Sequence, residues 1–300
     1  LGYEALARIT RSEPDVSIEE MFVLAEQCGK LWELEYLCRK KAMAGIGKDL
    51  ASQKLFLNVD PYVMYDPRFR EGMTRKYLKE YGISAANLVF EITERTNIRN
   101  EHMSLFQELV SHYQKENYQI AIDDFGKACA GIQRVIDLHP QFVKIDMDLI
   151  RDIHKSPEKS RALRRMVKFC KPLGIQLIAE GIEEREELRE LIRLGISYGQ
   201  GYLIAKPQEV PQPIAPEILQ LIQWERRITA KGDAAPGFQV QRDSLPGCRE
   251  AAVKGNTRRK KIQTGSKTKK EAARRRLFFS GNQLFPLLCS LSVKRLISSF

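Results

Sequence analysis

The chain has 300 residues, 43% of them hydrophobic, so it is long enough for one large domain with a sizeable core. Its formal net charge of +11 is uneven, because residues 1–207 hold 31 Lys or Arg and 31 Asp or Glu, whereas residues 208–300 hold 18 and 7. The basic character therefore says nothing about what the first two-thirds binds. The six cysteines form no C-x-x-C pair and no zinc-type cluster with histidine, which argues against a disulfide framework.

The chain shows no secretory signal and no run of about 18 apolar residues that could span a bilayer. We therefore expect a cytoplasmic protein, or the soluble part of a membrane-anchored one. Because the chain begins at Leu1 rather than at Met, we also expect it to be a fragment with further sequence upstream.

Short β-rich runs alternate with longer amphipathic segments through the first two-thirds of the chain. The predicted strands are Gly2–Ala7, Leu55–Val59, Leu88–Thr93, Gln119–Asp123, Phe142–Asp146, Ile175–Ala179 and Gly201–Ala205. The predicted helical segments include Ile18–Ala44, Met103–His112, Lys159–Lys171 and Glu184–Leu194. Such alternation predicts a mostly parallel sheet covered by helices on its faces.

An open doubly wound sheet and a closed (β/α)8 TIM-like barrel both fit this alternation. Polar side chains stand at the carboxyl end of nearly every predicted strand, and they decide between the two. A barrel brings all these ends to one face, where barrel enzymes keep their active sites, so we predict the barrel. Seven strands are visible, and we expect the eighth to precede Leu1. The polar residues are Glu4, Asn58, Glu91, Glu94, Asp123, Asp124, Lys144, Asp146, Glu180, Glu183 and Gln200.

The character of the chain changes after Pro207. A last helix is predicted from Pro213 to about Ile228, so the domain is assigned to residues 1–228 and a basic low-complexity tail to 229–300. We expect the tail to be disordered or non-native, and its deletion to leave folding unchanged. Binding of nucleic acid or a membrane through its clustered Lys and Arg is the less favoured alternative.

Packing so many carboxylates at one mouth is costly unless protons or cations neutralise them. Hard divalent cations with oxygen ligands are the natural solution, and the absence of Cys and His favours Mg²⁺ or Mn²⁺ over zinc. The adjacent Asp123 and Asp124 could serve two cations, as in two-metal hydrolysis of phosphoesters. A single acid at a strand end is more often a helix N-cap, and we expect that role for Asp148 and Glu184.

The motifs resemble those of the EAL-domain phosphodiesterases, which hydrolyse cyclic di-GMP to linear pGpG. The matching segments are EALAR (4–8), LFLNVDP (55–61), FEITE (90–94), AIDDFG (121–126), FVKID (142–146), IAEGIE (178–183) and QGYLIAKP (200–207). They occur in the family's order and cover about two-thirds of the chain. The resemblance implies a (β/α)8 barrel with one reversed strand.

The resemblance also implies roles for the polar residues. Two divalent cations, Mg²⁺ or Mn²⁺, would be held by Glu4, Asn58, Glu91, Asp123, Asp124 and Glu180, with Lys144, Glu180 and Glu4 catalytic. The substrate would be contacted by Arg8, Asp146 and Gln200. Glu94 would anchor the loop after the double-Asp strand, and Glu183 would support the site together with Gln200. The expected partners are cyclic di-GMP, a second copy of the barrel in a homodimer, and an upstream sensory or GGDEF-type domain.

One stretch departs from the family. After DDFG the family usually has a small or hydroxyl residue, then Gly and Tyr, whereas this chain has Lys127-Ala128-Cys129. An Ala in place of Gly is strained where φ is positive. The enzyme hypothesis therefore stands beside an alternative, in which the altered loop leaves a weak or inactive domain that acts as a cyclic di-GMP receptor or interaction module.

Overall fold

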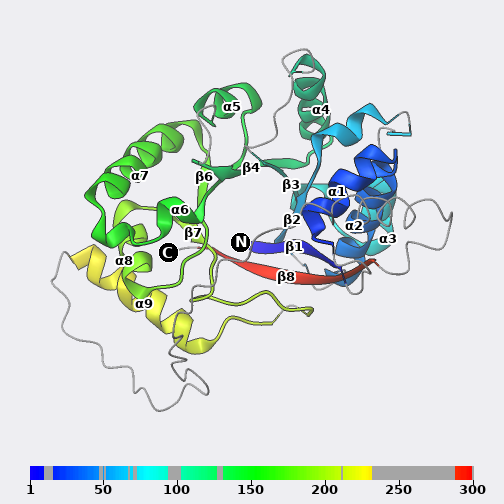
Figure 1. The fold of residues 1–300 in the computed structure, drawn as a ribbon. Coiled ribbons are helices and arrows are strands. Elements are labelled where there is room, and N and C mark those ends of the chain that lie inside the picture. Colours follow the sequence, from blue (N-terminus) through cyan, green and yellow to red (C-terminus); the bar gives the residue numbers. More distant parts are fainter. Residues whose placement is uncertain are drawn as a thin grey trace, which may run out of the picture.

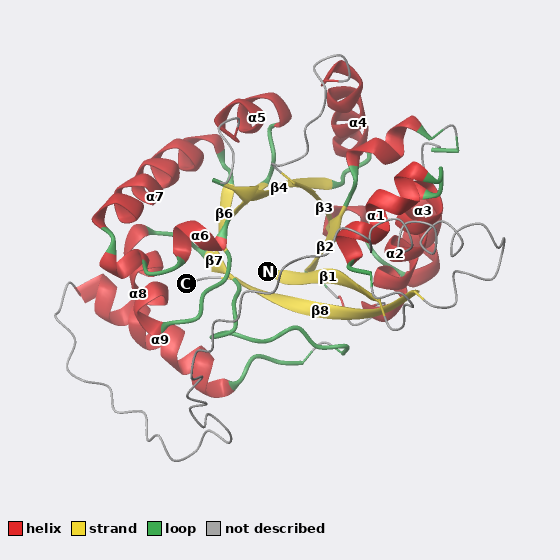
Figure 2. Cartoon of the chain, viewed as in Figure 1, coloured by secondary structure: helices red, strands yellow, loops and turns green. Residues whose placement is uncertain are grey.

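The computed structural model describes residues 1–9, 16–46, 50, 52–66, 68–69, 73–93, 103–126, 131–210, 212–231 and 288–298. Its eight strands close into a barrel in chain order, from β1 to β8, with the helices outside the ring (Figures 1 and 2). The strands are β1 Gly2–Ile9, β2 Lys54–Asn58, β3 Leu88–Thr93, β4 Gln119–Phe125, β5 Phe142–Ile145, β6 Gln176–Ala179, β7 Tyr198–Gly199 and β8 Leu288–Ser298. Neighbouring strands from β1 to β7 are parallel, so their carboxyl ends meet at one mouth. The predicted (β/α)8 barrel is confirmed.

The helices are α1 Ile18–Gln27, α2 Leu31–Ile46, α3 Met73–Tyr81, α4 Met103–Lys115, α5 Gly131–Leu138, α6 Met147–Ile150, α7 Pro157–Cys170, α8 Arg185–Leu194 and α9 Pro216–Lys231. Short 3-10 turns are η2 Pro61–Tyr65, η3 Ala85–Asn87, η5 Ile153–Lys155 and η6 Lys171–Leu173. None of the described helices combines the length and apolar character that crossing a bilayer requires.

The helix predicted over residues 18–44 is in fact two helices. Ser17 begins α1 with a capping box, in which its hydroxyl accepts from the backbone N–H of Glu20. Gly29 adopts a φ of +62°, which a helix cannot continue, and α2 starts two residues later. The apolar residues keep a helical spacing across Gly29, so the spacing alone predicts one helix instead of two.

The predicted strand Gly201–Ala205 is wrong. The last parallel strand is β7, at Tyr198–Gly199, and the residues after it turn, with the N–H groups of Ile204 and Ala205 both donating to Gly201 O. Gly201 lies so close to the loop after β6 that a Cβ there would be 2.1 Å from Ile182 O. The apolar residues after Gly201 therefore belong to this turn, in which Ile204 is buried, and do not pair in the sheet.

Strand β8 closes the barrel in reverse orientation, antiparallel to both β1 and β7. It therefore takes the place in the sheet where a strand preceding Leu1 was expected. Strand β8, Leu288–Ser298, comes from within the segment that was assigned to the tail. The physical reason is that β1 and β7 would otherwise leave two open sheet edges, whose backbone groups an antiparallel strand satisfies. Residues 232–287 lie outside the described part of the chain.

The core has two compartments. The larger one lies between the sheet and the helices, and includes Leu55, Phe90, Ile120 and Val143. The smaller one fills the inside of the barrel, and consists of Phe56, Val89, Ala121, Phe142 and Ile178. These inner residues alternate along the strands with members of the larger compartment, as the two-residue period of a strand requires.

Candidate active site at the carboxyl ends of the barrel strands

The candidate site is formed by the inward-facing side chains that come next along the strands, one step closer to the carboxyl ends than the inner apolar residues. Strand geometry returns a side chain to the same face every second residue, and the pairing between strands keeps this face common to the whole barrel. Two residues beyond the inner apolar positions come Asn58, Glu91, Asp123, Lys144 and Glu180. On β1 the same face carries Glu4. Arg8 lies on that face too, four residues closer to the mouth of the barrel. The barrel therefore brings together the polar residues that the sequence placed at separate strand ends.

Lys144 lies at the centre of this group and is fully buried. Its Nζ is 2.8 Å from Glu91 Oε1, 3.0 Å from Glu180 Oε1, 3.2 Å from Glu4 Oε1 and 3.3 Å from Asp123 Oδ1. Four strands thus direct a carboxyl group at one ammonium carried by a fifth. We call these four acids and Lys144 the acid cluster.

Burial and the charges of neighbouring side chains both shift pKa values within the acid cluster. Burial raises the pKa of Glu91 well above its ordinary value, Lys144 opposes this rise, and the nearby Glu4 adds to it. Burial lowers the pKa of Lys144, but the surrounding carboxylates outweigh that effect and hold it well above its ordinary value. The ammonium therefore stays charged, and the negative charge around it remains only partly neutralised.

The acid cluster fits divalent cations. One oxygen each from Glu4, Glu91 and Asp123 lie within 4.8 Å of one another, a spacing suited to shared ligation. Glu91 Oε2 is buried and accepts no hydrogen bond from any described residue, although a buried carboxylate oxygen normally has a partner. A donor set made of oxygens alone, with one carboxylate oxygen unsatisfied, suits a hard cation such as Mg²⁺ or Mn²⁺.

A β-bulge explains how two adjacent aspartates can both belong to a site. Between Ile122 and Phe125 the strand β4 advances three residues while β5 advances two, so β4 carries one extra residue. Asp124 sits in this bulge with a φ of +57°, and its N–H donates to Asp123 Oδ1 at 2.9 Å. In a regular strand Asp123 and Asp124 would face opposite sides of the sheet. Asp123 belongs to the acid cluster, whereas Asp124 lies beside it in the bulge.

Three further predicted residues lie around the acid cluster. Gln200 is fully buried, and its Nε2 donates to Glu180 Oε1. Glu183 forms a two-pronged ion pair with Arg151 at 2.5 and 2.7 Å, so it braces the loop after β6 rather than touching the cluster. Asp146 is buried and caps α6, accepting from the N–H of Asp148 at 2.9 Å.

Of the two predicted helix N-caps, one is correct and one is wrong. Glu184 is the N-cap of α8, as expected, whereas α6 is capped by Asp146 rather than by Asp148. Sequence reasoning missed Glu187, a fully buried carboxylate that accepts from the N–H groups of Asp152, Glu183 and Glu184. The available signal was its position three residues after the cap Glu184, which is the capping-box spacing.

Arg8 and Asn58 border a cavity of about 510 Å³. The cavity lies between the ends of β1 and β2 and the helices α1 and α2, and its other walls include Leu6, Phe22, Glu35 and Asp60. Arg8 is exposed, donates to Ala7 O, and pairs with no acidic side chain of the described residues. Its guanidinium is therefore available to an anionic ligand.

Two predictions fall outside the described residues. Glu94 and the altered stretch Lys127-Ala128-Cys129 belong to segments of which the structure gives no description. Their roles stay predictions.

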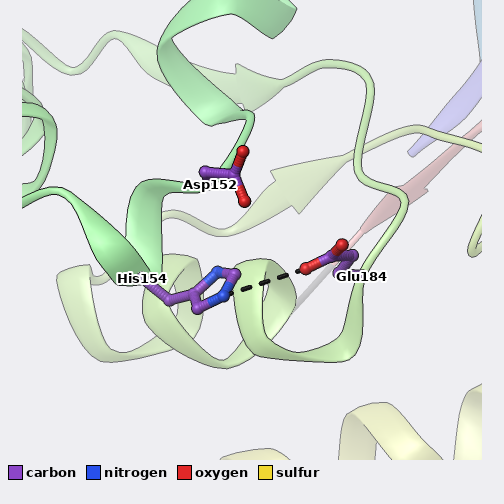
Figure 3. A group of neighbouring side chains, drawn as sticks. All are labelled: Asp152, His154 and Glu184. Carbon is purple, nitrogen blue, oxygen red and sulfur yellow. Dashed lines mark ion pairs between the residues drawn. The ribbon is translucent and has the colours of Figure 1, made fainter.

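A second group of potential metal ligands is formed by Asp152, His154 and Glu184, drawn in Figure 3. His154 Nε2 lies 3.8 Å from Glu184 Oε2. Lys155 Nζ is already 2.6 Å from Asp152 Oδ1 and 3.9 Å from Glu184 Oε2. The buried Nδ1 of His154 has no acceptor among the described residues, although metal-binding histidines normally fix that nitrogen with a hydrogen bond. This group is an ion-pair cluster on the surface.

The fold and the site together define a (β/α)8 barrel with an acidic, oxygen-only site at the strand ends. The model of the family named EAL domain matches residues 1–207, and the chain belongs to this family.

Among curated proteins, the Probable cyclic di-GMP phosphodiesterase PdeI of Escherichia coli K12 is 35% identical over 215 residues, which are 69% of this chain and 27% of PdeI. Cyclic di-GMP phosphodiesterase PA2567 of Pseudomonas aeruginosa is 32% identical over 230 residues, 75% of this chain and 37% of that protein. The chain thus spans only 27% to 37% of the length of these relatives.

Solved structures agree with the fold. A standalone EAL protein from Vibrio cholerae O395 in its c-di-GMP-bound form is 29% identical, with a TM-score of 0.56 over 69% of this chain and 82% of that one. Klebsiella pneumoniae BlrP1, in a complex with manganese and cyclic di-GMP, is 29% identical with a TM-score of 0.58, over 65% of this chain and 50% of BlrP1.

Proposed function

We propose that this domain is a metal-dependent phosphodiesterase that hydrolyses cyclic di-GMP to linear pGpG. The observation that carries the proposal is the acid cluster, four carboxyl groups around a buried lysine at the mouth of an EAL-family barrel. Relatives described as cyclic di-GMP phosphodiesterases, and a neighbour described as a manganese and cyclic di-GMP complex, support it.

The residues proposed to hold two cations are Glu4, Asn58, Glu91, Asp123, Asp124 and Glu180. Bound there, Mg²⁺ or Mn²⁺ would neutralise the phosphate and favour ionisation of the attacking water. The fit rests on the oxygen-only donor set and on the buried Glu91 Oε2 that lacks a donor among the described residues. Asn58 adds a neutral oxygen from an exposed position at the end of β2.

Lys144 is proposed to orient the attacking water through its ammonium rather than to remove a proton from it. The surrounding carboxylates hold its pKa well above the ordinary value, so it is a donor and a positive charge at any working pH. Glu180 is also proposed to take part in the reaction, because its Oε1 lies 3.0 Å from Lys144 Nζ and accepts from the amide of Gln200.

Substrate binding is proposed for Arg8, Asp146 and Gln200. Arg8 suits a phosphate of the substrate, because its exposed guanidinium borders the cavity between the ends of β1 and β2 and the helices α1 and α2. Asp146 caps α6. Its proposed contribution to substrate binding is therefore to fix the position of that helix as well as to contact the substrate.

A receptor that binds cyclic di-GMP without hydrolysing it is the second candidate. The observation in its favour is Lys127-Ala128-Cys129, which replaces the family's usual residues directly after the bulge that carries Asp124. Displacement of the bulge would weaken binding of the second cation, while Arg8 and its cavity would stay intact.

The test is incubation of the full chain with cyclic di-GMP and Mn²⁺, followed by separation of the nucleotides, with Asp124→Asn as the comparison. The enzyme proposal expects pGpG from the wild type and at least a hundredfold slower release from the variant. Binding without pGpG, unchanged in Asp124→Asn, would establish the receptor instead.

A further inference from the structure

The turn that follows Asn58 is held on two sides. Val59 donates its N–H to Glu91 O at 3.0 Å, which joins the turn to the next strand at a residue of the acid cluster. Asp60 caps the 3-10 turn η2, accepting from the N–H of Tyr62 at 2.9 Å. The remaining backbone donor of the turn is the N–H of Asp60, and its partner comes from outside the barrel.

That partner is Glu35 on α2. Its Oε1 accepts from the N–H of Asp60 at 2.8 Å, and its side chain is almost completely buried. A buried carboxylate is costly unless it is paired and hydrogen-bonded, so its presence here needs a reason. The contact joins a helix outside the barrel to the turn that carries Asn58 into the mouth.

Glu35 is itself held in place by Arg39. One guanidinium nitrogen of Arg39 lies 3.6 Å from Glu35 Oε2, and another donates to Thr74 Oγ1 at 2.9 Å. The same guanidinium lies 4.9 Å from the ring centroid of Phe90, the residue before Glu91 on β3. Glu35 is therefore a fixed acceptor, anchored to α3 and β3 through one arginine.

We propose that Glu35 is a positioning residue for the Asn58 side of the site, fixing the turn so that Asn58 stays in register with Glu91. The proposal rests on the proposed function, in which Asn58 and Glu91 hold a cation together. The pairing of these two residues in the sheet is the geometry that Glu35 preserves. Without the acceptor, the N–H of Asp60 would lose its partner in the fold, and the turn would be free to shift.

Three variants of the full chain test this. Glu35→Ala removes the acceptor, whereas Glu35→Gln keeps an oxygen that can accept from the N–H of Asp60. The control is Glu225→Ala, which removes a different buried carboxylate, one that pairs with Arg185 and Arg189 between α8 and α9. The control site lies across the barrel from α2 (Figure 1).

Two measurements are made on each variant: the affinity for Mn²⁺ by titration calorimetry, and amide hydrogen exchange in the peptide covering residues 57–63. For Glu35→Ala we expect about tenfold weaker Mn²⁺ binding and about tenfold faster exchange in that peptide. Glu35→Gln should recover both to within a few-fold, and Glu225→Ala should change neither. With cyclic di-GMP, Glu35→Ala should lower kcat/KM in proportion to the lost Mn²⁺ affinity.

Unchanged hydrogen exchange in residues 57–63 of Glu35→Ala would overturn the proposal. It would also be overturned if Glu35→Gln bound Mn²⁺ as weakly as Glu35→Ala does. Wild-type protein that binds Mn²⁺ but releases no pGpG would overturn the proposed hydrolysis and leave the positioning role intact. Wild-type protein that binds no Mn²⁺ would overturn both.

Discussion

The sharpest prediction concerns Lys144, whose replacement by Met keeps the length of the side chain and removes its charge. The ammonium faces four carboxyl groups at 2.8 to 3.3 Å and is fully buried. Removing one partner of a buried ion pair costs about 3–5 kcal/mol, because the remaining charge is left without compensation. Lys144→Met should therefore lose about 3–5 kcal/mol of unfolding free energy in EDTA at pH 8.

Divalent cations should return much of that loss, because they neutralise the same carboxylates. A ligand at a hundred times its dissociation constant stabilises the folded state by about 2.7 kcal/mol per site. Urea unfolding of wild type and Lys144→Met, each in EDTA and in Mn²⁺, measures both effects. The control is Lys168→Met on the exposed face of α7, which should change neither.

Equal stabilities of wild type and Lys144→Met in EDTA would refute the reasoning. So would an equal gain from Mn²⁺ in the two proteins, because the variant has more unneutralised charge for the cations to offset. Acid provides an independent check: lowering the pH should restore part of the lost stability, since protonation of Glu91, whose pKa is already raised by burial, removes one of the uncompensated charges.

Four further predictions follow from single contacts. Burial raises the pKa of Glu35 to about 7 from 4.5, so its contribution to stability is present below pH 4.5 and is lost as the pH rises to about 7. The difference in unfolding free energy between wild type and Glu35→Gln should therefore shift by about 3 kcal/mol over that range, in favour of the variant at high pH. Arg8→Ala should weaken cyclic di-GMP binding about tenfold in calorimetry and leave thermal unfolding unchanged, because the guanidinium is exposed. Deletion of residues 232–300 removes β8 and should lower the midpoint of thermal unfolding, whereas an unchanged midpoint would show that the barrel does not need this strand. Gly181→Ala should destabilise the protein by about 1–3 kcal/mol more than Gly195→Ala. Both glycines have positive φ, but only at the first would a Cβ meet helix α6, at 2.5 Å.

Much of the barrel could be predicted because its strands are short, apolar and followed by polar residues. The prediction of helices and strands failed where a single glycine interrupts a run of apolar residues. Gly29 divides a continuous apolar period into two helices, and Gly201 turns an apolar run into a loop packed against Ile182. Strand β8 could not be predicted, because it pairs with β1 across the whole length of the chain and has no local signal that names its partner.

The acid cluster was predictable as a set, because parallel strands that close into a barrel bring their carboxyl ends together. Its internal geometry was not. No local pattern indicates that Lys144 contacts four acids at once, nor that Asp146 caps a helix while Asp148 does not. Glu35 was unpredictable for a related reason, because a Glu on a helix is most often solvated, and only the tertiary fold buries this one beneath the turn after β2.

The two adjacent aspartates differ in how firmly the fold holds them. Asp123 is in register on β4 and contacts Lys144, so the neighbouring strands fix its position. Asp124 owes its place to the bulge, where its backbone has a φ of +57°, a conformation that persists only if the surroundings impose it. A change in the loop that follows Gly126 therefore acts on Asp124 before it acts on Asp123. Substitutions introduced after Gly126 should therefore loosen a cation held by Asp124 before one held by the acid cluster, so hydrolysis should fall before binding does.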